Sequence, residues 1–269
     1  MQPAIKMALR IARQSSDFLR NQHEKLEPAT QQAESVLRML ETIEQSVYEN
    51  SCEQLSKAYK DHYLAPAGDI HAEGHEKSWH VFPLLGVQNF SRGLPEFVTA
   101  LLQKRNNRPE HLVLISPLTG EEYSASRGYG AALNSRRIRT ANADHLNQTL
   151  ISCNLAAHSG RDQDPLLWPE ISGALADTES SLRFSGCPVL DLARVAGGKL
   201  DAAALSPVSD TELVLGGLLG QEAGALSGDL LGNPITERSH SILMANNRIF
   251  RECLKTLQPF RARLSKSVL

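Results

Sequence analysis

Two histidines stand close enough in the sequence to suggest a metal site. His71 and His75 are four positions apart, a spacing that places two imidazoles on one face of a helix and suits Zn²⁺. Gly68 and Gly74 interrupt the same polar stretch and favour an exposed loop instead. We therefore expect no zinc centre at this pair.

An acidic pair and a short basic cluster also fit known binding motifs in part, but both are explained by exposed, solvated segments. Asp162 and Asp164 fit the beginning of a calcium-binding loop, but the glycine and the closing glutamate of an EF-hand are missing at the required spacing. Arg136, Arg137 and Arg139 form a short basic cluster that is able to contact RNA phosphates. A cluster this short is typical of a solvated surface, so we do not expect direct nucleic-acid binding.

The familiar catalytic fingerprints are missing from the sequence. We find no Ser-His-Asp constellation, no P-loop and no G-x-G-x-x-G turn, and therefore expect no nucleotide cofactor. The cysteines are scattered without a C-x-x-C pair, which favours reduced thiols in a packed interior over disulfides or zinc. They are Cys52, Cys153, Cys187 and Cys253.

Hydrophobic periodicity predicts alternating helices and strands. Apolar residues at helical spacing predict two opening amphipathic helices, over residues 5–19 and 33–47. Asn106 to Pro109 is a breaker, and Leu112 to Ile115 follows as a buried strand. The remaining predictions are a turn over 118–121, strands over 122–126 and 149–153, a loop over 159–165, and helices over 188–196, 212–223 and 246–258.

Length and composition are those of a globular protein. The chain has 269 residues, 41% of them hydrophobic and 22% charged, enough for one large unit or two intimate subdomains. No apolar run reaches the roughly 18 residues that span a bilayer, and we find no signal peptide. We expect a cytoplasmic protein without membrane association. The formal charge of −2 provides no general attraction to nucleic acid or anionic lipid.

The segment Trp79–Phe90 reads W-H-V-F-P-L-L-G-V-Q-N-F. It resembles the W-[IV]-[IV]-D-P-[IL]-D-G-T-x-N-F signature of the inositol monophosphatase family, in which both aspartates hold catalytic Mg²⁺. Phe82 replaces the first aspartate, Leu85 the second, and Val87 the threonine that orients water. The positions that match are Trp79, Pro83, Leu84, Gly86, Asn89 and Phe90.

The resemblance extends over essentially the whole chain and is greatest to the bacterial SuhB-type members. Residues 8–13 resemble the first helix of those proteins. Matching blocks are Arg127–Asn134 (R-G-x-G-A-x-x-N), Ser185–Gly198 (S/T-G-x-x-x-L-D-L-A-x-V-A-x-G), Glu222–Gly224 (E-A-G) and Met244–Arg248 (A-A-N-N-R).

The other ligand positions of the family also depart from its pattern. The upstream E-E pair aligns with Ala67 and Gly68, and the glutamate that meets the substrate's hydroxyls aligns with Leu205. The W-D dipeptide aligns with Thr211 and Glu212, so Glu212 is the one carboxylate left at these positions. Mg²⁺ requires oxygen ligands, above all carboxylates. We therefore expect no metal and no catalytic residues at these positions.

The family's mobile lysine and V-T-x-x-D hairpin align with residues 34–44, where the pattern reads as continuous helix. Glu44 is the acidic residue near the position of the family's V-T-x-x-D hairpin. The fold implied by the resemblance is α/β (α+β), the layered α-β-α-β-α sandwich of the family. It consists of an N-terminal α+β subdomain over residues 1–145 and a C-terminal α/β subdomain over 146–269, in one compact unit.

Two functions remain open. The first is a non-catalytic, homodimeric pseudoenzyme that acts through protein contacts. By resemblance to SuhB-type proteins it would serve in transcription antitermination, with Nus factors and RNA polymerase as partners. The alternative is a residual Mg²⁺-dependent phosphatase acting on inositol-1-phosphate or a related sugar phosphate. The number of carboxylates at the ligand positions favours the first.

Overall fold

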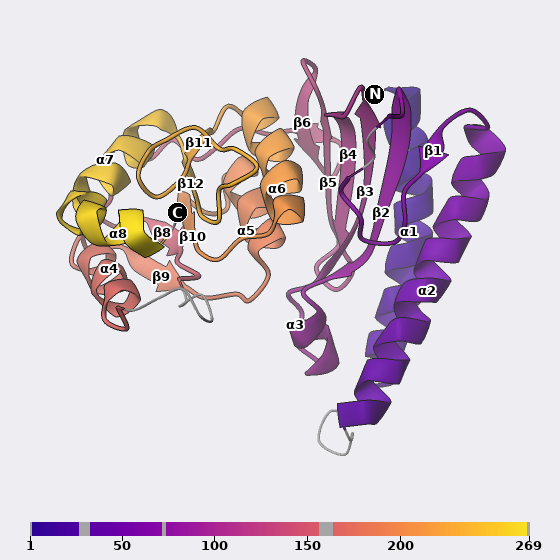
Figure 1. Ribbon diagram of the computed structural model, residues 1–269, viewed down its shortest axis with the longest axis horizontal. Helices are drawn as coiled ribbons and strands as arrows, with labels where there is room; N and C mark the ends of the chain where they lie inside the picture. The colour runs from indigo at the N-terminus through magenta and orange to yellow at the C-terminus, as the bar shows by residue number, and fades with distance from the viewer. Residues whose placement is uncertain (1, 27–32, 72–73, 156–163, 268–269) are drawn as a thin grey trace. The chain divides into compact units, whose positions relative to one another are not determined.

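The chain forms two compact units, Met1–Arg137 and Ile138–Leu269. The computed structural model describes residues 2–26, 33–71, 74–155 and 164–267, and Figure 1 shows its elements. The boundary expected from the sequence, after residue 145, falls within the segment that opens the second unit. No helix in the described ranges is both long and apolar enough to cross a membrane.

The first unit contains a seven-stranded sheet in the order β1-β2-β3-β4-β5-β6-β7. Only the β1–β2 pair is parallel, and the remaining neighbours are antiparallel. Its elements are α1 (Pro3–His23), α2 (Ala33–Ala58), β1 (Tyr63–Leu64), β2 (Lys77–Leu85), α3 (Val87–Ser91), β3 (Val98–Arg105), β4 (Arg108–Ser116), β5 (Glu121–Ser126), β6 (Gly130–Leu133) and β7 (Arg136–Arg137).

Helices α1 and α2 cover one face of this sheet, as Figure 1 shows. The predicted helical spacing is confirmed, and the apolar side of each helix is buried because the sheet presents every second residue to it. One cluster joins the helices to the middle of the sheet, and a second lies near α3. The first includes Ile5, Leu9, Ile11, Leu55, Trp79, Val81, Leu101 and Val113; the second includes Leu19, Leu40, Ile43, Val47, Leu84, Phe90 and Phe97.

A two-residue turn joins β3 to β4. Asn106 and Asn107 both have positive φ, 49° and 59°, which asparagine tolerates better than most residues and which a type I′ hairpin requires. The sequence predicts a breaker up to Pro109, with the strand beginning at Leu112. The strand instead begins at Arg108, because the turn needs only two residues and Pro109 is accommodated beside a register shift of the β3–β4 pair.

The second unit contains a five-stranded mixed sheet in the order β11-β12-β10-β8-β9. The predicted strand over 149–153 and the helices over 188–196, 212–223 and 246–258 are confirmed to within two residues at each end. The elements are β8 (Leu150–Ser152), α4 (Leu167–Ala176), β9 (Ser181–Arg183), α5 (Pro188–Ala196), β10 (Ala202–Leu205), α6 (Asp210–Ala223), β11 (Leu226–Gly228), β12 (Ile242–Ala245), α7 (Asn247–Leu257), a 3₁₀ turn (Gln258–Phe260) and α8 (Arg261–Ser267).

Helices lie on both faces of this sheet. Side chains of α4 and α7 pack on one face, where Ile151, Ala204 and Leu243 contribute from the strands. Side chains of α5 and α6 pack on the other face, against Ala203 and Met244. The second unit is therefore an α-β-α sandwich and the first an α-β layer pair. These are the layers expected of the α+β fold, and most of the predicted loop over 159–165 lies outside the described residues.

Candidate functional site

The turn that carries Ala67 and Gly68 lies beside strand β2. Gly68 has a φ of +72° and donates its N–H to the Val81 carbonyl at 3.0 Å. The Ala65 N–H reaches the Trp79 carbonyl at the same distance. Ala67 and Gly68 are exposed, and neither side chain offers an oxygen atom.

Phe82 and Leu85 occupy the end of β2. Phe82 is only 1% exposed, and its carbonyl accepts a hydrogen bond from Thr99 Oγ1 at 3.2 Å. Leu85 is half-buried at the last position of the strand, after a register shift between the two residues. Gly86 then turns with a φ of 86°, and Val87 begins α3 and packs on the apolar cluster beneath it.

Leu205 and Glu212, which align with functional positions of the family, pack in the core and cap a helix in this chain. Leu205 is fully buried at the end of β10, in the cluster that includes Leu192 and Leu213. Glu212 completes a capping box at the start of α6. Its Oε2 accepts the Ser209 N–H at 2.7 Å, and the Glu212 N–H reaches Ser209 Oγ at 3.3 Å. Burial raises the pKa of Glu212, although its bonds to Ser209 oppose that shift.

Residues 34–44 form the first part of α2, so the predicted continuous helix is confirmed. Glu44 is half-buried there. Burial and the nearby Glu41 both raise its pKa, whereas a neighbouring cation would lower it.

These residues do not fit Mg²⁺. Alanine, glycine, phenylalanine and leucine provide no side-chain oxygen, and the carboxylate of Glu212 is engaged in capping its own helix. Within the described ranges, no three His, Cys, Asp or Glu side chains are grouped so as to hold a metal ion. The family's ligand positions in this chain therefore do not provide the oxygen ligands that Mg²⁺ requires.

Sequence reasoning missed a buried polar cluster that holds the Ala67–Gly68 turn. His80 Nδ1 lies 2.8 Å from the Asp69 carbonyl, and its Nε2 lies 2.9 Å from Ser78 Oγ. Lys104 Nζ donates to the Ile70 carbonyl at 2.5 Å. Because the Asp69 carbonyl only accepts, the proton is assigned to Nδ1.

Both basic groups of this cluster are shielded from solvent. His80 is fully buried and Lys104 is 5% exposed. Desolvation lowers the pKa of both groups, although the Asp69 carbonyl and carboxylate oppose the shift. The sequence signal was His80 itself, which stands where the family signature has isoleucine or valine.

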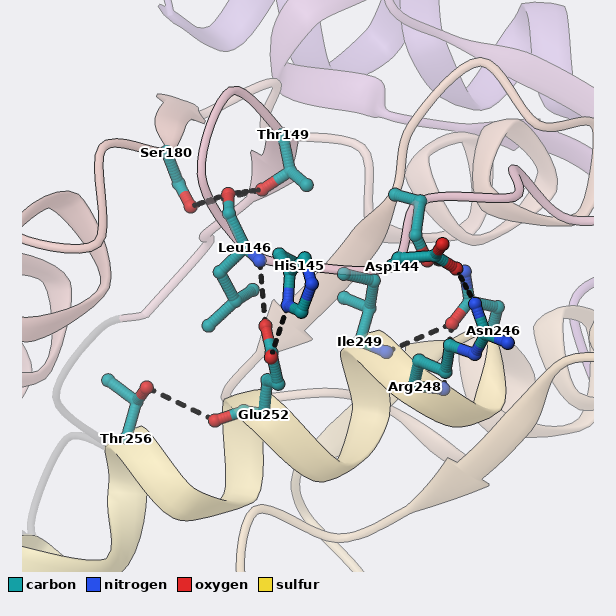
Figure 2. A network of polar contacts seen from close by, with 11 residues as sticks. Asp144, His145, Leu146, Thr149, Ser180, Asn246, Arg248, Ile249, Glu252 and Thr256 are labelled. Atoms are coloured by element: carbon teal, nitrogen blue, oxygen red, sulfur yellow. Dashed lines mark hydrogen bonds and ion pairs between the residues drawn. The ribbon is translucent and has the colours of Figure 1, made fainter.

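Residues of α7 make polar contacts with the segment that leads into β8, as Figure 2 shows. Asn246 caps α7 by accepting from the Arg248 and Ile249 N–H groups, and its Nδ2 donates to the carbonyls of Ala141 and Ala143 at 2.9 and 2.8 Å. Glu252 Oε2 accepts the Leu146 N–H at 2.7 Å. Asn246, from the A-A-N-N-R block, and Glu252, further along α7, thus fasten the segment that leads into β8 onto α7.

Asp191 makes buried hydrogen bonds that connect elements of the second unit. It is fully buried in α5, and Oδ2 accepts hydrogen bonds from Ser152 Oγ at 2.7 Å and Ser185 Oγ at 2.5 Å. Burial raises its pKa, and these hydrogen bonds oppose the shift. The S-G-x-x-x-L-D block therefore joins α5 to β8 in the interior of the unit.

The histidine, aspartate and arginine candidates from the sequence lie in different parts of the structure. His75 stacks on Tyr63 with ring centroids 3.8 Å apart. Asp162 lies outside the described residues, while Asp164 pairs with Arg263 at 2.6 Å. Of the basic cluster, Arg136 and Arg137 are exposed on β7 of the first unit, and Arg139 belongs to the second unit, where it donates to the Glu222 carbonyl.

Known proteins resemble this chain along its length. The model of the inositol monophosphatase family matches residues 1–262. A protein named Nus factor SuhB from Pseudomonas aeruginosa is 31% identical over 264 residues, which cover 96% of this chain and 97% of that protein. An inositol-1-monophosphatase from Mesorhizobium japonicum is 32% identical over 213 residues, covering 78% and 79% of the two chains.

Solved structures have the same fold. The native crystal structure of the extragenic suppressor protein SuhB from Bartonella henselae has a TM-score of 0.80 and 21% identity, covering 96% of this chain and 99% of that one. An inositol monophosphatase from Anabaena has a TM-score of 0.78 at 21% identity. The chain belongs to the inositol monophosphatase family.

Proposed function

We propose that this chain is a non-catalytic member of the inositol monophosphatase family that acts as a homodimeric protein-binding factor in transcription. The observation that carries the proposal is the absence of carboxylates from all but one of the family's ligand positions. Phe82 and Leu205 are buried within packed elements, and Glu212 caps a helix. Hydrolysis of a phosphate ester in this family depends on Mg²⁺, and these residues offer it no ligand set.

The partner class follows from the relatives. Proteins named Nus factor SuhB resemble this chain over 96% of its length in Pseudomonas aeruginosa and in Pasteurella multocida. A factor that binds other proteins needs an intact surface and fold, which the structural roles of Asn246 and Asp191 preserve. RNA polymerase and Nus factors are the partners to test first, and a two-fold dimer is the default oligomer of such scaffolds.

Capture from lysate tests the partner. The tagged full chain is used as bait, with an inositol monophosphatase that carries the complete aspartate motif as the matched control. Enrichment of RNA polymerase or Nus factors by this chain supports the proposal, whereas their absence after repeated captures contradicts it. Light scattering at micromolar concentration tests the dimer, which a purely monomeric mass would exclude.

A second experiment addresses catalysis and metal. A ligand that binds only the native state raises the melting temperature, so we expect millimolar Mg²⁺ to leave the melting temperature of this chain unchanged. We also expect no hydrolysis of inositol-1-phosphate above a protein-free control. A chelator-sensitive rise in melting temperature, or chelator-sensitive turnover of inositol-1-phosphate, would contradict the non-catalytic proposal.

The competing function is residual phosphatase activity. It is favoured by the similarity to a protein named inositol-1-monophosphatase, which is 32% identical over 213 residues. Activity would require carboxylates from positions other than the family's own, so its variants would have to map elsewhere in the chain.

A further inference from the structure

The tip of the β3–β4 hairpin forms a hollow of about 470 Å³ within the first unit. Its lining is Arg105, Asn106, Arg108, Pro109, Glu110 and Arg127, and we call it the arginine hollow. None of these residues belongs to the family's ligand positions, and the volume lies in the range of small-molecule sites.

The tight turn concentrates positive charge. Because Asn106 and Asn107 form a two-residue turn, Arg105 and Arg108 pair directly across the two strands. Like charges directly opposite one another in a sheet are destabilising. Glu110 offsets one of them, since its Oε2 lies 3.2 Å from Arg105 Nε.

A third guanidinium is held against the same strand. The Arg127 N–H donates to the Glu110 carbonyl at 2.9 Å, and its Nε donates to the Pro109 carbonyl at 2.7 Å. The first bond holds the backbone of Arg127 against β4, and the second restrains its side chain at the wall of the hollow. A guanidinium has five N–H donors, and the bond to Pro109 uses the one on Nε.

The charges of the lining indicate the ligand. Three guanidiniums and one carboxylate leave an excess of two positive charges. A phosphate monoester carries about −1.5 to −2 at pH 7, and the planar fork of arginine matches its oxygens. We propose that the arginine hollow binds the phosphate group of a small phosphate monoester, or inorganic phosphate itself.

The surroundings favour a small anion over a nucleic-acid strand. The Glu76 carbonyl accepts the Asn106 N–H at 2.7 Å, which places an acidic residue next to the turn. The whole chain has 28 Lys and Arg against 30 Asp and Glu. A strand of RNA needs a row of cations along its backbone, whereas the excess charge here is local.

Titration of the full chain with phenyl phosphate and with inorganic phosphate, at constant ionic strength, tests the site by calorimetry. We expect saturable binding in the micromolar to millimolar range, weakened about tenfold by Arg108→Gln or Arg127→Gln and further by the double variant. The matched control is Arg38→Gln, which removes an exposed arginine of α2 paired with Glu34 at 3.3 Å. It should bind within about twofold of the parent.

The two ligands distinguish the source of the phosphate. Equal affinities identify the phosphate group alone as the recognised part, and tighter binding of phenyl phosphate shows that the hollow also contacts the organic part. Arg108→Lys keeps the charge without the fork and should bind less tightly than the parent. Circular dichroism and melting temperature confirm that each variant is folded.

Three results would overturn the site. The first is a parent protein that shows no saturable binding, and the second is a folded double variant that binds as the parent does. The third is a short single-stranded RNA that binds more tightly than phenyl phosphate with a steep salt dependence, which would mark a nucleic-acid surface instead. None of these results bears on catalysis or on the transcription partner, because the hollow is independent of the proposed function.

Discussion

Substituting Phe82 by aspartate restores the first carboxylate of the family signature at a position that is 1% exposed. Two costs follow from that burial. Truncating a buried phenylalanine costs about 3–5 kcal/mol. The new carboxyl group must then either stay charged without a partner or take up a proton, and at pH 7 neutralising a group of ordinary pKa near 3.9 costs about 4 kcal/mol.

The expected loss for Phe82→Asp at pH 7 is therefore about 7–9 kcal/mol, which approaches the entire stability of many proteins. The sign of the pH dependence follows from linkage. Burial raises the pKa of the new carboxyl in the folded state, so the penalty grows as pH rises above 3.9. At pH 5 the protonation cost falls to about 1.5 kcal/mol, and Phe82→Asp should be less destabilised there than at pH 7.

Urea unfolding at pH 5 and pH 7 measures both quantities. Phe82→Asn is the matched control, because it removes a similar volume and adds polarity without a titrating group. Its loss of stability should therefore be the same at both pH values. Phe82→Leu should cost about 1.5 kcal/mol or less. Leu85→Asp provides a milder case that stays folded, since Leu85 is only half-buried.

Two outcomes would contradict the conclusion that the surroundings of Phe82 offer no partner to a carboxylate. A Phe82→Asp variant that matches Phe82→Asn at pH 7 would show that the carboxylate finds stabilising partners at this position. A rise in melting temperature with Mg²⁺ in the Phe82→Asp, Leu85→Asp double variant, absent from the parent, would identify those partners as a latent metal site.

Two further predictions concern the capping box and the buried histidine. Ser209→Ala should lower the stability by about 0.5–2 kcal/mol. Glu212→Gln should cost less stability than Glu212→Ala, because the amide oxygen still accepts the Ser209 N–H. Equal losses for these two variants in thermal unfolding would show that Glu212 does not stabilise the protein through the cap. Burial lowers the pKa of His80, so the unfolded chain binds more protons and stability should fall as pH drops through 6.5, by at most about 1.4 kcal/mol per pH unit from this group. His80→Asn should reduce the change of stability with pH, as measured by urea unfolding between pH 7.5 and 5.5. An unchanged pH dependence would mean that it comes from other groups such as His62 and His111, whose pKa values burial also lowers.

Local signals in the sequence predicted much of the fold. The 3.6-residue spacing of apolar residues predicted α1 and α2, because each helix buries one stripe whatever its partner is, although α2 continues beyond the predicted 33–47 to Ala58. The helix over 188–196 begins at a proline and ends before a glycine, and the structure confirms both ends. The blocks that resemble the family identified the turns at Gly86 and Gly128, where a positive φ favours glycine.

Tertiary structure decided the character of the candidate site. Ser209 and Glu212 stand at capping-box spacing in the sequence, yet only the start of α6 at Asp210 shows that the carboxylate is used as a cap. His80 and Lys104 are far apart in the chain and come together because β2 and β3 pair with Ser78 opposite Lys104. Sequence spacing does not reveal such contacts, because sheet register sets them.

The arginine hollow depends both on local sequence and on tertiary structure. The Asn106-Asn107 pair determines a tight turn locally, through the left-handed conformations that asparagine tolerates. Arg127 is brought to the same hollow only by the pairing of β4 with β5, which places its side chain against the Pro109 carbonyl. The sequence by itself determined the turn and the types of charge, whereas their convergence required the register of three strands, because pairing between strands brings together residues that sequence spacing leaves apart.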